Sequence, residues 1–119
     1  ITRRQIEELL HRLRRDPTWH RDNTVYDLVS DFIVPWTKGS GHSYALQVNV
    51  EAPQEVNLMV SHAWGENAED FLETLLRSTF DQDVAFICAL SLYQAGDTAG
   101  PSVAEQLGVS ARESPFRRV

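Results

Sequence analysis

Residues 56–76, VNLMVSHAWGENAEDFLETLL, decide the fold of this chain. The apolar run 56–60 predicts a buried β-strand, because it is short, rich in Val and Leu, and bounded by turn residues. The turn 61–66 follows, and the spacing predicts a helix that begins near Glu66 or Asn67. Acidic residues crowd the first turn of that helix and an arginine lies near its end, as the helix dipole favours. The inward face of the helix comprises Ala68, Phe71, Leu72, Leu75 and Leu76.

A second apolar run, VAFICALSL at residues 84–92, predicts another strand, because a near-continuous apolar run is typical of a strand covered on both faces. The order strand, helix, strand implies two parallel strands joined by a right-handed crossover. We therefore expect an α/β fold with a partial doubly wound parallel sheet in flavodoxin-like order, preceded by two α-helices. Two strands alone do not make a stable sheet of this kind, so we expect a domain that lacks its C-terminal strands or borrows strands from elsewhere.

The N-terminal residues carry clear helix signals. Thr2 and Gln5 have the spacing of a capping box, and Ile1 and Ile6 have that of a hydrophobic staple. The Asp-Pro pair at residues 16–17 is expected to end this helix, because the residue before a proline disfavours helical geometry. The apolar face of the helix comprises Ile6, Leu9, Leu10 and Leu13.

Three further elements are predicted from spacing. A second helix is expected to run from a cap at Asn23 or Thr24 to Pro35, because proline ends helices. Residues 44–50, YALQVNV, alternate between apolar and other residues and predict a further strand. Residues 101–107 predict a short helix, opened by a proline and closed by a glycine. The apolar stripe of the second helix comprises Val25, Leu28, Val29, Phe32 and Ile33.

The composition is that of one globular domain. The chain has 119 residues, of which 42% are hydrophobic and 24% charged. We expect an N-terminal helical segment with its loop (residues 1–42) and an α/β module (residues 43–119). No apolar run approaches the roughly 18–20 residues of a membrane span. The single cysteine, Cys88, excludes an internal disulfide and fits a reducing intracellular compartment, cytoplasmic or organellar. Because the sequence begins with Ile1 rather than Met, we expect a piece of a longer protein.

Charge is distributed unevenly along the chain. Residues 1–21 carry six arginines against three acids, a net charge of +3, whereas residues 22–111 carry two basic residues against thirteen acids, a net charge of −11. Two interpretations follow: the basic helix is an interface for an anionic partner, or it lies on the acidic body of its own domain. The acidic body argues against nucleic acid as the main ligand.

The turn 61–66 and the loop 91–97 are candidate binding loops. In open parallel sheets ligands bind at the carboxyl ends of the strands, so these two loops converge if the strands are neighbours. The Trp64 indole could stack on a base or a nicotinamide-like ring. Gly65 lets backbone N–H groups approach a phosphate, although the Glu66 carboxylate would oppose an anion there. The alternative is structural: the same residues cap, fill the turn and seal the sheet edge. The candidate ligand-binding residues are Ser61, His62, Trp64, Gly65 and Gln94.

The strand and helix of residues 58–75 resemble the opening of Toll/interleukin-1-receptor-like (TIR-like) domains. The pattern Ser-His-Ala-Trp-Gly at 61–65 is also similar to the Ser-Tyr-x-Trp-Gly of fungal heterokaryon-incompatibility domains, with His for Tyr. The stretch 86–94, FICALSLYQ, is similar to the Trp-Ile-Asp-x-x-Cys-Ile-Asn-Gln of that group. Protist and algal TIR-like proteins with a Ser-His-x-Trp-Gly-Glu module look most similar, and they share the Pro-containing helix end at 31–37 and the Ser-Tyr-Ala at 43–45.

The resemblance implies a signalling or assembly module, in a parent protein that binds or cleaves NAD-type nucleotides. It also implies a catalytic Glu within a Trp-Cys-x-x-Glu pattern, which this chain lacks; Glu105 lies on the wrong helix. We therefore expect no catalysis by this chain alone and no resident cofactor other than an NAD-type nucleotide. The resemblance further implies a self-association loop that contains Tyr93, Gly96, Asp97 and Gly100. The alternative is a non-enzymatic subunit of a larger complex, which uses the basic helix and the sheet edge as interfaces.

Other chemistries are poorly represented. The four histidines and Cys88 lack the spacing of known metal motifs, so no metal site is expected. Ser61 and His62 are adjacent on an extended strand end and point to opposite faces, so they cannot act together as nucleophile and base. Cys88 has no resolving partner and is expected to be a small core residue.

Overall fold

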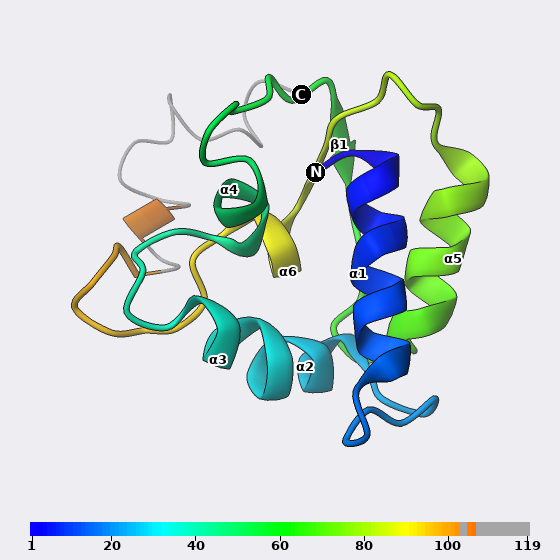
Figure 1. Ribbon diagram of the computed structural model, residues 1–119, viewed down its shortest axis with the longest axis horizontal. Helices are drawn as coiled ribbons and strands as arrows, with labels where there is room; N and C mark the ends of the chain where they lie inside the picture. The colour runs from blue at the N-terminus through cyan, green and yellow to red at the C-terminus, as the bar shows by residue number, and fades with distance from the viewer. Residues whose placement is uncertain (103–104, 107–119) are drawn as a thin grey trace.

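The strand, turn and helix predicted for residues 56–76 are present in the computed structural model, which describes residues 1–102 and 105–106. The strand covers only Leu58–Val60 and is half-buried, not buried as predicted. Helix α5 begins directly after Asn67, whose side chain accepts a hydrogen bond from the Asp70 N–H. Figure 1 shows the arrangement of the elements along the chain. They are α1 (Arg3–Arg15), α2 (Val25–Leu28), η1 (Val29–Ile33), α3 (Val34–Thr37), α4 (Tyr44–Val48), β1 (Leu58–Val60), α5 (Ala68–Ser78), β2 (Ala85–Ile87) and α6 (Cys88–Ser91).

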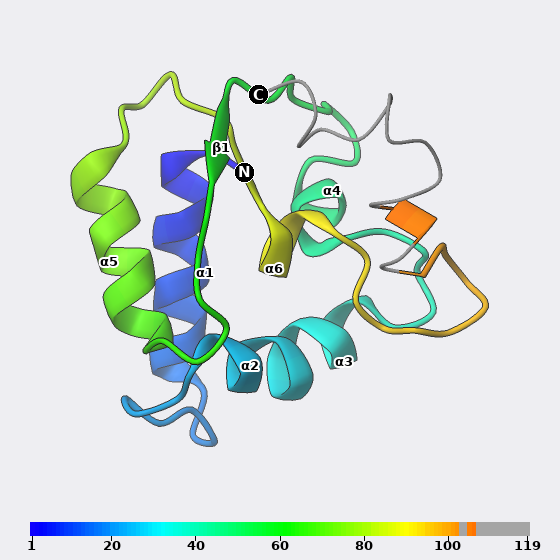
Figure 2. The ribbon, with the colours of Figure 1, turned by 180° about the vertical axis from the view of Figure 1, so that it is seen from behind.

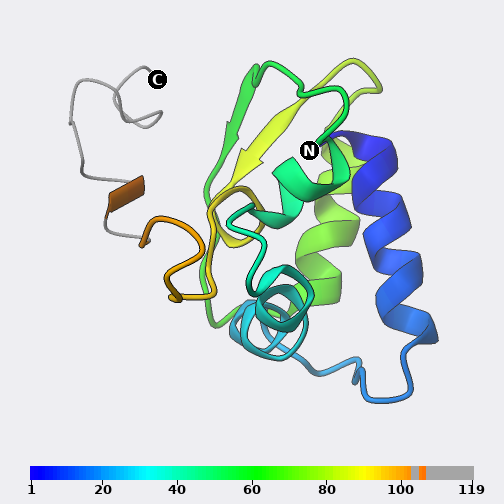
Figure 3. The same cartoon turned by 60° about the vertical axis from the view of Figure 1, so that its left-hand side comes forward.

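The strands β1 and β2 are parallel neighbours, as predicted (Figure 3). Leu58 pairs with Ala85, and Val60 with Ile87. The first two residues of the chain add a short antiparallel contact on the other side of β2, where the Ala85 N–H donates to the Ile1 carbonyl at 2.8 Å. The architecture is therefore α/β, with a two-stranded parallel sheet among the described residues.

Helices α1 and α5 lie side by side on one side of the sheet (Figures 1 and 2). The predicted capping box of α1 is confirmed, because Thr2 and Gln5 each accept a hydrogen bond from the other's backbone N–H. The helix ends at Asp16, before the proline, as predicted. The four residues of its predicted apolar face are all buried, and they pack into the same core as Leu72 of α5.

The second predicted helix begins as expected but does not end at Pro35. Thr24 is its cap, with the Asp27 N–H donating to the Thr24 hydroxyl. The helical path then continues through the π-helical turn η1 and into α3, where Pro35 occupies one of the first two positions. Pro35 lacks the backbone N–H that would bond to the preceding turn, and the helical path changes there from the π-helical pattern of η1 to α3.

The strand predicted for residues 44–50 is wrong, because Tyr44–Val48 form the short helix α4. The Ser43 hydroxyl caps this helix by accepting the Leu46 N–H at 3.1 Å. Asn49 then joins its end to α1 by accepting the Gln5 side-chain amide at 2.7 Å. Capping by Ser43 and this tertiary contact override the alternating pattern, and of the alternating residues only Tyr44 is buried.

The strand predicted for residues 84–92 is only partly correct. Strand β2 ends at Ile87, and Cys88–Ser91 turn into the helix α6. The Ile87 N–H donates to the Ser91 hydroxyl at 3.0 Å, which closes this turn locally. An apolar run cannot by itself distinguish a long buried strand from a short strand followed by a buried helix.

One hydrophobic core joins the helices to the sheet. Residues from the first 42 positions share this cluster with residues that follow them, including Leu28, Tyr44, Leu72 and Leu90. The predicted helix 101–107 lies mostly outside the described residues. None of the helices in the described part of the chain has both the length and the apolar character that a membrane crossing requires.

Candidate functional site

The turn that follows β1 is bonded to the start of α2. The Tyr26 N–H donates to the Trp64 carbonyl, and the Val25 N–H donates to the Glu66 carbonyl, each at 3.0 Å. Figure 2 shows the chain leaving β1 and passing beside α2 before it enters α5. These backbone bonds fix the turn, so its side chains occupy defined positions.

His62 supports the helix α6 instead of pointing freely into solvent. Its Nε2 atom accepts the Ala89 N–H at 3.3 Å, while its Nδ1 atom is buried without a hydrogen-bond partner in the described structure. Burial lowers the pKa of His62, and the nearby Glu66 carboxylate opposes that shift only in part. The imidazole is therefore neutral near pH 7 and satisfies a backbone N–H at the start of a short helix.

Gln94 approaches the same helix from the second loop. Its Nε2 atom donates to the Cys88 carbonyl at 2.8 Å. The two loops therefore converge, as the parallel strands predicted, but His62 and Gln94 meet the backbone of α6 there. Their hydrogen-bonding groups are engaged in holding this helix, which leaves less of them for a ligand.

Trp64 belongs to a row of rings that crosses the rim of the sheet. It stacks on Tyr26 with ring centroids 5.4 Å apart and an interplanar angle of 29°. His62 meets Trp64 edge to face at 5.1 Å and reaches Phe71 of α5 at 5.3 Å. We call Tyr26, Trp64, His62 and Phe71 the aromatic row.

Tyr26 also belongs to this rim, although it is not among the residues predicted for the site. Its side chain is 61% exposed although it stacks on Trp64. A usable signal was present, because Tyr26 falls outside the apolar stripe of its own helix. A large aromatic on the polar face of a helix indicates a contact beyond the core.

Ser61 and Gly65 are the most weakly constrained of the predicted residues. Both are exposed. A Cβ atom placed on Gly65 would meet no atom within 4 Å, and Gly65 does not adopt a positive φ. Neither the backbone geometry nor a close neighbour therefore requires glycine at this position.

The loop that the resemblance assigned to self-association is anchored on its own chain. Tyr93 is 1% exposed. The Gly39 N–H donates to the Tyr93 hydroxyl at 3.1 Å and to Asp97 at 2.9 Å, and the Tyr93 hydroxyl donates to Asp97. Hydrogen bonds, chiefly from Tyr93, lower the pKa of the Asp97 carboxyl. Two of the four residues are thus committed to a contact within the chain.

The two glycines of that loop differ. Gly96 is exposed and adopts a φ of +68°, which glycine accommodates without strain. Gly100 lies against the Tyr93 ring, where an added Cβ atom would come within 2.7 Å of it, and against the backbone of Gly41. Gly100 is therefore a packing residue, and Gly96 is the exposed tip.

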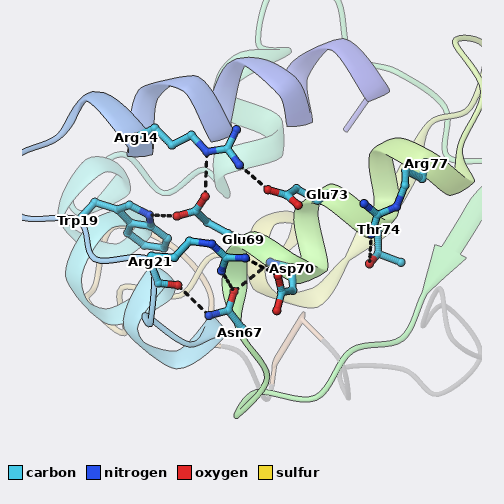
Figure 4. A network of polar contacts seen from close by, with 9 residues as sticks. All are labelled: Arg14, Trp19, Arg21, Asn67, Glu69, Asp70, Glu73, Thr74 and Arg77. Atoms are coloured by element: carbon cyan, nitrogen blue, oxygen red, sulfur yellow. Dashed lines mark hydrogen bonds and ion pairs between the residues drawn. The ribbon is translucent and has the colours of Figure 1, made fainter.

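A buried carboxylate joins α1 to α5 (Figure 4). Glu69 is 3% exposed and accepts hydrogen bonds from Arg14 at 2.8 Å and from the Trp19 indole at 3.0 Å. Burial alone would raise its pKa, but these two donors outweigh burial, so the pKa of Glu69 lies below its usual value. In the sequence, Glu69 is one of the acidic residues of the first turn of its helix, and its role in the core is not visible there because the side chains that bind it come from distant residues.

The basic N-terminal segment lies on the acidic body of its own domain, which is the second of the two interpretations of its charge. Arg14 also pairs with Glu73, and Arg21 contacts Asp70 and Asn67, each at 2.6 Å (Figure 4). Arg12 lies 3.6 Å above the Trp36 ring. These arginines are thus engaged within the chain.

Two hollows accompany these elements. A groove of about 310 Å³ lies along the start of α5, beside the Phe71 end of the aromatic row. It is lined by Glu66, Asn67, Asp70, Phe71 and Thr74, and we call it the acidic groove. A separate cavity of about 260 Å³ lies between α4 and β2, with apolar residues such as Leu46, Val56 and Phe86 in its wall.

The described residues offer little to a metal or a reactive thiol. Among residues 1–102 and 105–106, no group of three or more His, Cys, Asp or Glu side chains is placed to hold a metal ion. Burial raises the pKa of the half-buried Cys88 thiol, so the nucleophilic thiolate is disfavoured near pH 7.

No protein-family model matches this chain, and no curated protein or solved structure matches it either.

Proposed function

We propose that this chain is a TIR-like signalling or assembly module whose rim, at the carboxyl ends of β1 and β2, binds a partner protein without catalysis. The parallel pair of strands would form part of a doubly wound sheet. The turn after β1, with its Ser-His-x-Trp-Gly-Glu sequence at 61–66, supports the proposal together with the parallel register.

The observation that carries the proposal is that the polar side chains of the rim bond to the protein's own backbone, whereas aromatic rings of the rim are accessible to solvent. His62 and Gln94 direct their polar groups to the backbone of α6. Of the two stacked rings, that of Trp64 is half-buried and that of Tyr26 is exposed. Aromatic surface with few free polar groups is typical of protein interfaces, whereas a nucleotide site needs converging polar groups.

The test measures nucleotide chemistry and assembly on the purified chain. We expect NAD⁺ to remain intact in its presence, and added NAD⁺ not to shift the NMR signal of the Trp64 indole. Sedimentation over a range of concentrations measures self-association. Tyr26→Ala tests the rim, and Phe80→Ala is the matched control, because Phe80 is also exposed, at 68%, but lies outside the aromatic row. Consumption of NAD⁺ would contradict the proposal.

A second candidate function is a structural role in a larger complex. The observation that favours it is an apolar patch over α4 and the residues that follow it, where four large apolar side chains are exposed: Leu46, Val48, Val50 and Val56. Patches of this kind on soluble domains mark protein contacts. Val48→Ser with Val56→Ser should reduce binding of a dye specific for apolar surface and should abolish assembly if this candidate is correct. Assembly that survives these changes but not Tyr26→Ala assigns the interface to the rim.

A further inference from the structure

The acidic groove and the aromatic row meet at Phe71. The Phe71 ring lines the groove and also lies 5.3 Å from the ring of His62. Glu66 lines the same groove, and its carboxylate makes no hydrogen bond or ion pair within the described residues. Asp70 also lines the groove, and its carboxylate forms an ion pair with Arg21. The groove thus combines one aromatic wall, one carboxylate without a partner and one carboxylate that binds a guanidinium.

This chemistry suits a cation with a flat or aliphatic body. An arginine side chain can lay its stem along Phe71, direct its guanidinium to Glu66, and stack on a neighbouring ring. The chain already shows both contacts in its own residues. Arg21 bonds to Asp70, and Arg12 lies over the Trp36 ring. An arginine of a partner would therefore make the same two kinds of contact, with a carboxylate and with an aromatic ring, that arginines make within this chain.

Charge determines which class of partner fits. The whole chain carries a net charge of −6, and two carboxylates, those of Glu66 and Asp70, line the groove itself. A phosphate or a nucleic acid would be repelled at this point, whereas a basic peptide would be attracted. Arg12, Arg14 and Arg21 are engaged in contacts within the chain, so a second copy has fewer arginines to offer.

We propose that the acidic groove and the aromatic row together bind an arginine-bearing segment of a partner protein. The inference rests on the proposed function and names the partner's chemistry. Glu66 receives the guanidinium, Phe71 supports its stem, and the exposed ring of Tyr26 covers a neighbouring residue of the segment.

The probe is a short peptide with spaced arginines, and its control is the same peptide with citrulline at those positions. Citrulline keeps the shape and removes the charge. Titration into the isotope-labelled chain should shift the signals of the Trp64 indole and of the Glu66 and Phe71 amides. Glu66→Gln should weaken binding by about tenfold, which is the scale of one charge-assisted hydrogen bond. Tyr26→Ala should weaken it by roughly three- to tenfold.

The controls separate this site from general attraction to an acidic protein. Glu55→Gln removes one exposed carboxylate far from the groove in sequence and should leave the affinity within about twofold, since exposed charges contribute little. Unchanged signals from the core residues show that each variant is folded. Equal binding of the citrulline or a lysine peptide, or equal binding to Glu66→Gln, would overturn the arginine assignment. NAD⁺ cleavage would overturn the proposed function instead, so the two failures are distinguishable.

Discussion

The contact between α1 and α5 and the junction between β1 and α6 bury polar side chains in opposite ways. In the first, Glu69 keeps its charge because Arg14 and the Trp19 indole both donate to it. In the second, His62 stays neutral and accepts one backbone N–H, while its Nδ1 atom has no hydrogen-bond partner among the described residues. Both residues come from the same strand, turn and helix, only seven positions apart.

The difference indicates which of the two contacts is costly to break and which is easily broken. A buried charge with full hydrogen bonding stabilises one arrangement and is expensive to disturb. A neutral imidazole with one free nitrogen is a weaker link, because losing it costs a single hydrogen bond. We therefore expect the α1–α5 contact to make the larger contribution to the unfolding free energy of the chain and the β1–α6 junction to make a smaller one.

The largest effect should come from Glu69→Ala. The change leaves the Trp19 indole and Arg14 without their shared acceptor and opens a gap between two packed helices. Because Arg14 is partly exposed and can turn to water, we expect a loss of about 2–4 kcal/mol of unfolding free energy. Urea denaturation measures it.

Glu73→Ala is the matched control for that change. Glu73 also pairs with Arg14, but its side chain is one third exposed. The loss should stay below about 1 kcal/mol, as is usual for exposed ion pairs. Equal losses for the two variants would show that burial of Glu69 is not what makes this contact strong.

Helices α1, α2 and α5 were predictable from sequence because their signals are local. The capping box of Thr2 and Gln5 and the apolar face of α1 lie within a few residues of each other, and the structure contains both. The cap of α5 at Asn67 is a similar case. Such patterns depend on hydrogen bonds to neighbouring backbone, which a sequence displays directly.

Helices α4 and α6 and the candidate site were predicted less well because they depend on distant residues. Helix α4 forms where alternation predicted a strand, because Ser43 caps it and Asn49 docks on Gln5. The convergence of the two loops was correctly inferred from the parallel strands. The backbone targets of His62 and Gln94 on α6 could not be inferred, because α6 itself was read as strand.

The next largest effect should come from His62→Leu. The substitution keeps an apolar side chain against Phe71 but leaves the Ala89 N–H without its acceptor. We expect a loss of about 1–2 kcal/mol, the cost of one unsatisfied backbone group. Hydrogen exchange at the Ala89 amide should accelerate more than exchange within α1. Equal acceleration in α1 would show that the two regions unfold as one.

The pH dependence should separate the two regions into different windows. The folded-state pKa of His62 lies below its ordinary value of 6.5, so the unfolded chain takes up a proton first and stability falls as the pH drops below about 6.5. The folded-state pKa of Glu69 lies below its ordinary value of 4.5, so its contribution is present above about 4.5 and is lost as the pH falls through the lowered value. Stability should therefore decline in two steps.

Two variants assign these steps in thermal unfolding measured across pH. His62→Gln should reduce the step at the higher pH, because an amide does not titrate in this range; the buried N-terminal amine, whose pKa burial also lowers, still contributes there. Glu69→Gln should reduce the step at the lower pH, to which Asp16 and Asp97 also contribute because hydrogen bonds lower their pKa values. Steps of unchanged size in both variants would mean that other groups govern acid unfolding.

The smallest effect on stability should come from Tyr26→Ala. A small loss of stability is what we expect of a residue that serves partner binding and not the fold. The Tyr26 ring is 61% exposed and contacts the fold through its stack on Trp64, and an aromatic pair of this kind contributes about 0.5–1.5 kcal/mol. We expect a loss near the lower end, measured by urea denaturation, because helix formation at α2 depends on Thr24 and not on this ring. A large loss would place Tyr26 with Glu69 among the residues that hold the fold. A small loss beside impaired partner binding would mean that the ring is kept exposed for contact, as the rim of β1 and β2 requires if it is an interface.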